Sequence, residues 1–518
     1  MSTITETRQV GGQVELADPA AVADSRYANP ELLPVPLSKR TWTTYNYIAI
    51  WMGMAHAISS YLLASGLIVL GMSWLQAFLT ITVANLLVLI PMLLNSHAGT
   101  KYGIPFPVFA RAFFGVRGAS LAALLRALVA CGWFGIQTWI GGQAIYTVVG
   151  RLTGAGWTNA SSFGGQPWTL WVSFAAFWLV QMALIWRGIN ALRRFENWAA
   201  PMVTLAFTAL LVYMLVKAGG IGPVLHQSGS LGWGSKFWVV FWPSLMAMIA
   251  YWATLSLNMP DFTRFSKGQK QQVWGQVLGL PTTMSYIAIV SIIVTSAATV
   301  VYHTTIWDPV ALTTKFSSTA VVVIGLIMII LATMSVNVAA NVVSPSYDFS
   351  NIAPRLVSFR TGGLITGVIG IAIQPWRLLS DPHVYIYTWL GFYGGLLGTI
   401  AGVLIAGYWV RWRTSLSLGS LYTPDGRYWF AGGWNWRAVA ATVAGAVLSV
   451  GGAYTAPGTG GPFPANGLIP ALKSLYDYSW VIGLGVGFAV YLVLSLPVFG
   501  RPDAPREQDD LVTDVARG

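Results

Sequence analysis

Apolar residues in this 518-residue chain gather in long runs, which short polar segments interrupt at intervals. A helix needs about 20 mostly apolar residues to cross the hydrocarbon core of a bilayer. Twelve runs reach that length, so the pattern predicts an all-α membrane protein with twelve transmembrane helices. The predicted ranges are 45–70, 74–95, 119–149, 168–187, 197–217, 238–259, 276–302, 319–343, 361–379, 384–410, 436–455 and 478–499.

The composition supports a membrane protein and excludes a nucleic-acid-binding one. Hydrophobic residues make up 55% of the chain and charged residues only 9%, whereas soluble proteins contain about 25% charged residues. The net charge of +12 could suggest a polyanionic partner, but the basic residues are concentrated in alternate loops. That distribution is the topology signal of a protein embedded in a lipid bilayer, and no nucleic acid is expected as a partner.

The loop charges also predict an orientation. Basic residues cluster after the even-numbered spans, and the opposite loops contain few, so both termini are expected in the cytoplasm of a protein of the plasma (inner) membrane. Residues 1–40 and 501–518 are polar and are predicted to be disordered cytoplasmic tails around a transporter domain at 41–500. Nothing in the sequence predicts an oligomeric state. The clustered basic residues include Lys101, Arg111, Arg117, Arg187, Arg193, Arg194, Arg264, Lys267, Lys270, Arg355, Arg360, Arg411, Arg413 and Arg427.

Small and polar residues interrupt two predicted spans that lie five apart. The first span contains WMGMAHAISSYLLASG (51–66), and the sixth contains MIAYWATLSLNMPDFTR (248–264). Paired interruptions in corresponding positions of two halves indicate an inverted-repeat transporter with a binding site at mid-membrane. The alternative is that the glycines and serines only allow close helix packing.

The third span contains a tryptophan and an amide on one face. Trp133 and Gln137 are four residues apart, so they are neighbours on a helix. A buried amide without a partner costs about 1–3 kcal/mol. An indole face beside an amide donor and acceptor suits a small planar molecule with ring NH and C=O groups. The alternative is a structural glutamine that bonds to a neighbouring backbone beside a packed indole.

Two other spans contain similar groups. The eighth, LATMSVNVAANVVSP (331–345), places Asn337 and Asn341 on one face with Ser335 close by. Carboxamides in a membrane are costly unless they meet each other, a ligand or an ion, although asparagine also links helices structurally. The sixth span has Tyr251 and Trp252 in its middle, away from the headgroup level where aromatic belts lie.

The spans lack the groups on which an enzyme depends. The sequence contains no phosphate-binding Gly-Lys loop, no HEXXH motif and no Gly-x-Ser-x-Gly elbow, and no metal-ligating cluster is evident. The first span has no acidic residue to hold an organic amine, only His56. We therefore expect a non-enzymatic protein that binds a neutral ligand. A transporter of this architecture for amino acids or amines, and a facilitator without cation coupling, remain as alternatives.

Five stretches resemble the nucleobase:cation symporter-1 family, whose members carry hydantoins, allantoin, uracil and other nucleobases. The resemblance implies a LeuT-like fold with two inverted five-helix repeats, at about 45–217 and 238–410, and two extra helices at about 436–499. It also implies cation-coupled alternating access. The stretches are NSHAGTKYGIPFPVFARAFFGVRG (95–118), RALVACGWFGIQTWIGGQAIY (126–146), YWATLSLNMPDFTRF (251–265), SVNVAANVVSPSYD (335–348) and QPWRLL (374–379).

The resemblance implies substrate-binding roles by position. Trp133 corresponds to the residue that stacks on one face of the ring, and Trp252, with Tyr251 beside it, to the aromatic group on the other face. Gln137 corresponds to the amide that bonds to the polar edge. Position 57 departs from the hydantoin and allantoin carriers, because Ala57 offers no amide to the substrate. The choice between allantoin and a pyrimidine such as uracil therefore stays open.

Three further residues take roles from the same resemblance. Asn341 matches the carboxamide that completes the polar contacts with the substrate, and Asn337 lies one turn away. Leu390 aligns with a side chain of the tenth helix that helps to gate the site.

The family cation site uses backbone carbonyls of an unwound first helix, here around Gly53 and His56. It also uses oxygens of the eighth helix, here of Ala332 and Ser335, and hard cations such as Na⁺ prefer oxygen ligands. The sodium-coupled hydantoin carrier has a threonine hydroxyl where this chain has Val336. Coupling to Na⁺, to H⁺ through His56, or to neither therefore stays open.

Overall fold

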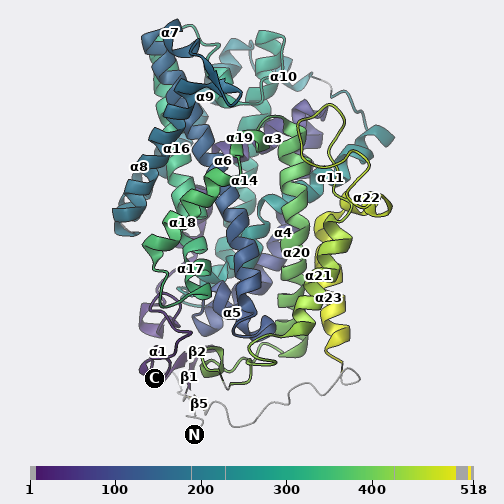
Figure 1. Ribbon diagram of the computed structural model, residues 1–518. Coiled ribbons are helices and arrows are strands. Elements are labelled where there is room, and N and C mark those ends of the chain that lie inside the picture. Colours follow the sequence, from purple (N-terminus) through teal and green to yellow (C-terminus); the bar gives the residue numbers. More distant parts are fainter. Residues whose placement is uncertain (1–6, 188, 228, 425, 497–511, 515–518) are drawn as a thin grey trace.

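The computed structural model describes residues 7–187, 189–227, 229–424, 426–496 and 512–514, and long helices arranged side by side dominate it (Figure 1). The α-helices are α1 (Ala20–Ala23), α2 (Thr44–Ala55), α3 (Ile58–Val69), α4 (Trp74–Tyr102), α5 (Phe106–Phe114), α6 (Ala119–Thr153), α7 (Ala155–Thr158), α8 (Trp168–Arg187), α9 (Ile189–Lys217), α10 (Ile221–Leu225), α11 (Ser235–Tyr251), α12 (Ala253–Asn258), α13 (Pro260–Thr263), α14 (Gln269–Tyr302), α15 (Pro309–Thr313), α16 (Thr319–Asn341), α17 (Val343–Ile352), α18 (Phe359–Ala372), α19 (Pro375–Leu378), α20 (Gly391–Ile405), α21 (Trp436–Val450), α22 (Lys473–Tyr476) and α23 (Ser479–Leu494). The remaining elements are the 3₁₀ turns η1 (Leu37–Lys39), η4 (Gly419–Leu421) and η5 (Pro470–Leu472), the π-helical segments η2 (Val384–Leu390) and η3 (Ala406–Arg411), and the strands β1 (Thr7–Val10), β2 (Gln13–Leu16), β3 (Ser162–Phe163), β4 (Gln166–Pro167) and β5 (Val512–Asp514).

Several helices have the length and apolarity of membrane spans. Within the described residues, six meet this test: α4, α6, α8, α14, the continuous α16–α17 stretch and the stretch Val384–Arg411. Two further pairs meet it only when a bent pair is taken as one span, α2 with α3 at 60° and Pro470–Tyr476 with α23 at 100°. The helix pattern thus agrees with a polytopic membrane protein, while the count of twelve spans stays a prediction.

Both predicted interruptions are present as breaks in the helices. In the first span α2 ends at Ala55 and α3 begins at Ile58, because His56 and Ala57 leave the helical conformation. In the sixth span Trp252 separates α11 from α12. Such breaks place unpaired backbone groups and side chains in the interior, where they need partners other than water.

The stretch Val384–Arg411 has irregular ends that its sequence did not predict. Residues Val384–Leu390 and Ala406–Arg411 are π-helical and flank the α-helical segment α20. A π-helical turn changes the direction in which side chains point, and such turns often lie at functional sites. The segment η2 packs against α11, next to the break in the sixth span.

The N-terminal segment is folded from residue 7 onward, which differs from the predicted disorder. Strands β1 and β2 pair antiparallel, and β5 pairs parallel with β1, so strands from the N-terminal and C-terminal parts of the chain form one small sheet at one end of the bundle (Figure 1). The apolar side chains of Val14, Leu16, Val22 and Leu32 are buried in the core. The sequence did not predict this folded segment, because its few apolar residues are scattered in a polar stretch and do not recur at the spacing of a helix or a strand. Most of the predicted C-terminal tail lies outside the described residues.

A buried arginine fastens this segment to the bundle. Arg40 donates through Nε to the carbonyl of Val35 and through Nη2 to that of Val14, each at 2.8 Å, and its Nη1 reaches the carbonyls of Thr100 and Lys101 at 3.3 Å. Burial lowers the pKa of Arg40 to about 10, because a low dielectric disfavours the charged form. The side chain nevertheless stays charged at neutral pH and joins four carbonyls.

We expect Arg40→Ala to destabilise the protein strongly, by about 3 kcal/mol or more, because it leaves buried carbonyls without a charged donor. The neighbouring Lys39 is exposed, so Lys39→Ala is a matched control with an expected effect within about 0.5 kcal/mol. Thermal unfolding of the two purified variants in one detergent measures the difference. Equal melting temperatures would show that Arg40 does not hold the N-terminal segment.

Candidate functional site

A chain of hydrogen bonds joins the two helix breaks to α6. The hydroxyl of Tyr251, the last residue of α11, shares hydrogen bonds of 2.8 Å with the hydroxyls of Ser59 and Ser60 in α3. Gln137 of α6 donates through Nε2 to the Ser59 hydroxyl at 2.9 Å. The hydroxyl of Tyr385 in η2 donates to the Ser59 carbonyl at 3.1 Å. Four elements therefore meet at one serine beside the break in the first span.

The predicted aromatic residues form one cluster around Tyr251. The ring of Tyr251 lies edge-on to Trp133 at 5.1 Å and to Trp252 at 4.8 Å between ring centres. Trp252 in turn meets Trp51 edge-on at 5.1 Å. These are the T-shaped arrangements that aromatic quadrupoles favour. Both indoles that the sequence assigned to the two faces of a ligand thus contact the same phenol.

Four polar atoms of this cluster are buried without a hydrogen-bond partner among the described residues: Oε1 of Gln137 and the indole Nε1 atoms of Trp51, Trp252 and Trp389. The amide oxygen is an acceptor, and the three indole N–H groups are donors. An unpaired buried polar group costs about 1–3 kcal/mol, so each such group in a folded protein needs an explanation. A bound molecule that presents both NH and C=O groups supplies the missing partners.

The two asparagines of α16 differ in their bonding. Asn337 is fully buried; its Nδ2 donates to Oε1 of Gln181 at 2.6 Å and to the carbonyl of Phe134 at 3.1 Å. Its Oδ1 accepts from Nδ2 of Asn341 at 3.0 Å. Both ends of the Asn337 amide are therefore engaged by protein, as in the helix-linking alternative. Oδ1 of Asn341 accepts no hydrogen bond from the described residues, so this side chain is the one of the pair with a free acceptor.

Three aromatic residues of the tenth span complete the cluster and were missed in the sequence. Tyr385, Trp389 and Tyr393 surround Trp133 with ring centres 6.1–6.3 Å away, and Trp133 donates through Nε1 to the Tyr393 hydroxyl at 3.1 Å. Their four-residue spacing puts them on one helical face, a signal that the sequence did contain. Leu390, the predicted gating residue, is fully buried at the end of η2.

The predicted cation site lies where α16 contacts both halves of the broken first span. Ala332 and Ser335 are buried on α16. His56 bonds elsewhere, since its Nδ1 shares a 2.7 Å hydrogen bond with the hydroxyl of Thr204 in α9. Gly53 lies in the last turn of α2, which ends at Ala55 just before the break. This donor set of carbonyls and one hydroxyl fits a hard monovalent cation.

A buried ion pair was also missed by the sequence reasoning. Arg126 of α6 lies 3.2 Å from the carboxylate of Asp348 in α17, with both side chains almost fully buried. Close by in the same half of the bundle, Asn258 of α12 donates to the Ser344 hydroxyl at 2.6 Å. These contacts link the sixth and eighth spans and α6 at the end of the bundle that contains the chain termini. Sequence spacing could not show them, because the partners are 86 and 222 positions apart.

The fold and the site together define the class of protein. Long apolar helices and two broken spans that meet at a polar, aromatic centre are the architecture of a multi-pass integral membrane transporter. Residues 34–483 match the family described as permeases for cytosine/purines, uracil, thiamine and allantoin. The chain belongs to this family, which consists of transporters and not of enzymes.

Relatives match over nearly the whole chain. An allantoin permease of Bacillus subtilis is 40% identical over 480 residues, which cover 91% of this chain and 93% of the relative. The purine-uracil permease NCS1 of Arabidopsis thaliana is 38% identical and covers 91% and 78%. The structure of Mhp1, a nucleobase-cation-symport-1 family transporter in a closed conformation with bromovinylhydantoin bound, is 25% identical, with a TM-score of 0.72 over 93% of this chain and 99% of Mhp1.

These matches confirm the resemblance that the sequence motifs indicated, and they confirm the LeuT-like all-α membrane fold. They do not test the roles of individual residues, which stay predictions.

The bonding of the two asparagines predicts that they respond differently to truncation. Asn337→Ala removes the hydrogen-bond partners of Oε1 of Gln181 and Nδ2 of Asn341, so we expect a loss of stability of about 2–3 kcal/mol. Asn341→Ala removes one bond at the edge of the network and should cost about 1 kcal/mol. Thermal unfolding in detergent compares them, and an equal or larger effect of Asn341→Ala would contradict the assignment.

Proposed function

We propose that this protein imports a neutral planar nitrogen heterocycle, of the allantoin, hydantoin, uracil or related nucleobase class, by cation-coupled alternating access. The observation that carries the proposal is that Oε1 of Gln137, an acceptor, and Nε1 of Trp252, a donor, are both buried without a partner among the described residues and belong to one aromatic cluster. A lactam or ureide ring offers an NH to the first atom and a C=O to the second. Its flat faces suit the indoles of Trp133 and Trp252.

Binding in this cluster requires Tyr251 to move. Its ring now contacts both indoles, so a ring that lies between Trp133 and Trp252 takes over those contacts. The Tyr251 hydroxyl is bonded to Ser59 and Ser60 beside the first helix break. Substrate binding is thereby coupled to the broken span that is predicted to hold the cation.

The chemistry of the cluster favours a neutral substrate over an amino acid or amine. The hydrogen bonds of its described members join uncharged groups: an amide, hydroxyls, an indole and a carbonyl. The site then discriminates between substrates through their hydrogen bonds. An analogue that lacks an NH or C=O group leaves the buried amide of Gln137 or Asn341 without a hydrogen-bond partner. The names of the relatives, allantoin permease and purine-uracil permease, support the same substrate class.

The remaining parts of the proposal concern orientation and gating. The basic loops support cytoplasmic termini in the plasma membrane. Leu390 and Tyr385 of η2 then close the site on the outer side. The Arg126–Asp348 and Asn258–Ser344 contacts close it on the cytoplasmic side, and alternate opening of these two closures moves the substrate across.

For the coupled cation we propose carbonyls around Gly53 and His56 together with the oxygens of Ala332 and Ser335. The alternatives are coupling to Na⁺, to H⁺ through His56, or to neither, since Val336 supplies no hydroxyl.

Removal of a substrate-binding amide should abolish uptake. We expect Gln137→Leu and Asn341→Ala each to lower uptake of radiolabelled allantoin or uracil by at least about tenfold, with normal amounts of protein in the membrane. Gln143→Leu, on the same helix as Gln137 and only half-buried, is the control and should keep wild-type uptake. Unchanged transport in either site variant would remove that residue from the site.

A hydroxyl at position 336 should strengthen sodium coupling. We expect Val336→Thr to lower the sodium concentration for half-maximal uptake by roughly tenfold, equivalent to about 1.4 kcal/mol, because hard cations prefer oxygen ligands and the hydroxyl adds one. Val338→Thr, also buried on α16, is the matched control. Uptake is measured with sodium replaced stepwise by choline. An identical response of the two variants would argue against a cation site at Ser335 and Ala332.

A further inference from the structure

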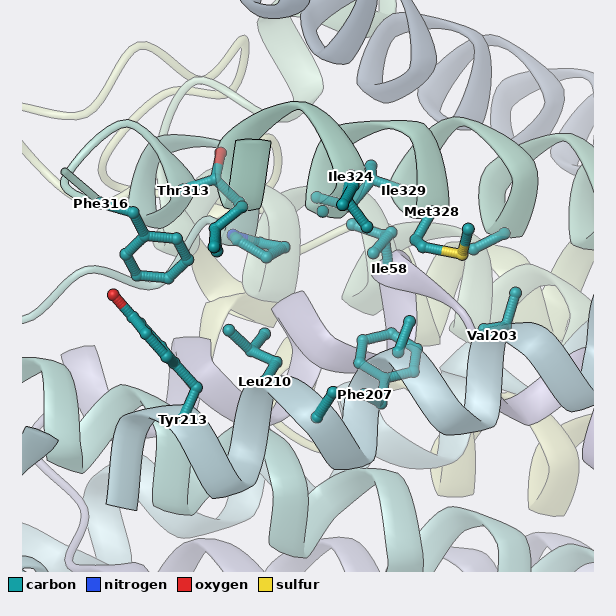
Figure 2. Close-up of a pocket in the computed structure, with 16 residues that line it drawn as sticks. Ile58, Val203, Phe207, Leu210, Tyr213, Thr313, Phe316, Ile324, Met328 and Ile329 are labelled. Carbon is teal, nitrogen blue, oxygen red and sulfur yellow. The ribbon is translucent and has the colours of Figure 1, made fainter. Parts of the chain in front are cut away.

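A cavity of about 340 Å³ lies between α9 and α16, with α15 and the first residue of α3 also in its wall (Figure 2). Side chains from the two long helices point toward one another across it, among them Phe207 and Leu210 of α9 and Met328 of α16. The deepest residues, Ile58 and Ala332, are buried in the core. The volume lies in the range of small-molecule sites, and the cavity is separate from the aromatic cluster.

The mouth of this cavity opens on the apolar outer surface of the bundle. Val321 and Ile324 line it and are 40% and 60% exposed, and α16 belongs to a stretch with the length and apolarity of a membrane span. Exposed apolar side chains on such a helix face lipid chains. An apolar cavity offers water no partners, so it either stays dry or takes an apolar occupant.

Basic residues lie beside one end of the cavity. Nζ of Lys217, the last residue of α9, is 5.3 Å from the ring centre of Tyr213, and that ring packs on Phe316 at 4.8 Å. Both rings line the cavity. Arg151 donates to the carbonyl of Ser317, the residue after Phe316, at 2.8 Å. The cavity therefore combines an apolar slot with exposed positive charge at the helix ends.

We propose that this cavity binds one acyl chain of an anionic phospholipid, with its phosphate group beside Lys217 and Arg151. The acyl chain matches the apolar cavity, and the phosphate matches the basic side chains at its end. Burial of apolar surface and the attraction between basic side chains and anionic lipids both stabilise such a complex. The carboxylate of Asp308, next to the lining residue Pro309, caps α15 by accepting from the N–H of Val310 at 2.8 Å.

A lipid in this position contacts the transport machinery. Ile58 is the first residue after the break in the first span, and Ala332 is a predicted cation ligand. The acyl chain fills the space between α9 and α16 beside both residues, so it supports the packing of the broken helix. The proposal does not depend on which heterocycle, or which cation, the protein carries.

Photo-crosslinking tests the site directly. Full-length protein in nanodiscs receives phosphatidylglycerol or phosphatidylcholine with a diazirine at the end of one acyl chain, and peptide mass spectrometry maps the labelled residues. We expect phosphatidylglycerol to label peptides of α9 and α16 that line the cavity roughly fivefold more than phosphatidylcholine does. Even labelling of all lipid-facing helices would overturn the proposal.

Variants separate the chain from the head group. Gly325→Phe places a large side chain in the cavity. A Cβ at this position meets only Thr313, at 3.7 Å, so α16 can accept a side chain there. We expect the lipid probe no longer to label the residues that line the cavity. Ile327→Phe, 41% exposed and not among the lining residues, is the control with labelling intact. Lys217→Gln should lower phosphatidylglycerol labelling roughly fivefold, whereas Lys236→Gln, also an exposed lysine, should not.

Three results would contradict the proposal. Unchanged labelling in Gly325→Phe would show that the chain does not enter the cavity. If phosphatidylglycerol and phosphatidylcholine label the cavity equally, and Lys217→Gln does not change this, the site does not select an anionic head group. A photoreactive amino acid placed at the cavity mouth, at Ile324, that crosslinks two copies of the chain would show that a second protein molecule, and not a lipid, covers this face. Thermal unfolding confirms that each variant is folded before labelling.

Discussion

Polar groups at the two helix breaks have to find partners away from water, and this constraint organises the centre of the protein. Ser59 satisfies it for the first break, because its hydroxyl and carbonyl bond to Gln137, Tyr251 and Tyr385. The second break ends at Tyr251 and Trp252, which pack against the same group of residues. Two irregular segments that would be unstable alone in a bilayer thus stabilise one another and α6.

The same constraint explains why the site suits a heterocycle. Among the described polar atoms of the centre, Oε1 of Gln137 and the indole Nε1 atoms of Trp51, Trp252 and Trp389 have no hydrogen-bond partner, so one acceptor and several donors are left for a ligand. Asn337 is held by Gln181 and Phe134, so it positions Asn341 and does not offer its own amide. A neutral ring with both donor and acceptor edges completes this arrangement without bringing a charge into the membrane, where an unpaired charge is costly.

Local sequence patterns predicted the features that depend on local chemistry. The apolar runs gave the long helices, the glycine- and serine-containing interruptions gave the two breaks, and the four-residue spacing of Trp133 and Gln137 placed them on one face. Contacts between distant segments could not be predicted in this way. Examples are the pairing of Arg126 with Asp348 and the folding of residues 7–40 onto the bundle through Arg40. In both cases tertiary packing brings the partners together, and the local spacing of residues in the sequence does not indicate the contact.

The most direct test of the account is a structure of the protein with bound allantoin or uracil. The account predicts the heterocycle between Trp133 and Trp252, with its NH within hydrogen-bond distance of Oε1 of Gln137 and the Tyr251 ring displaced from its present contacts. A ligand bound elsewhere, with Tyr251 still against both indoles and the Gln137 oxygen still without a partner, would contradict it.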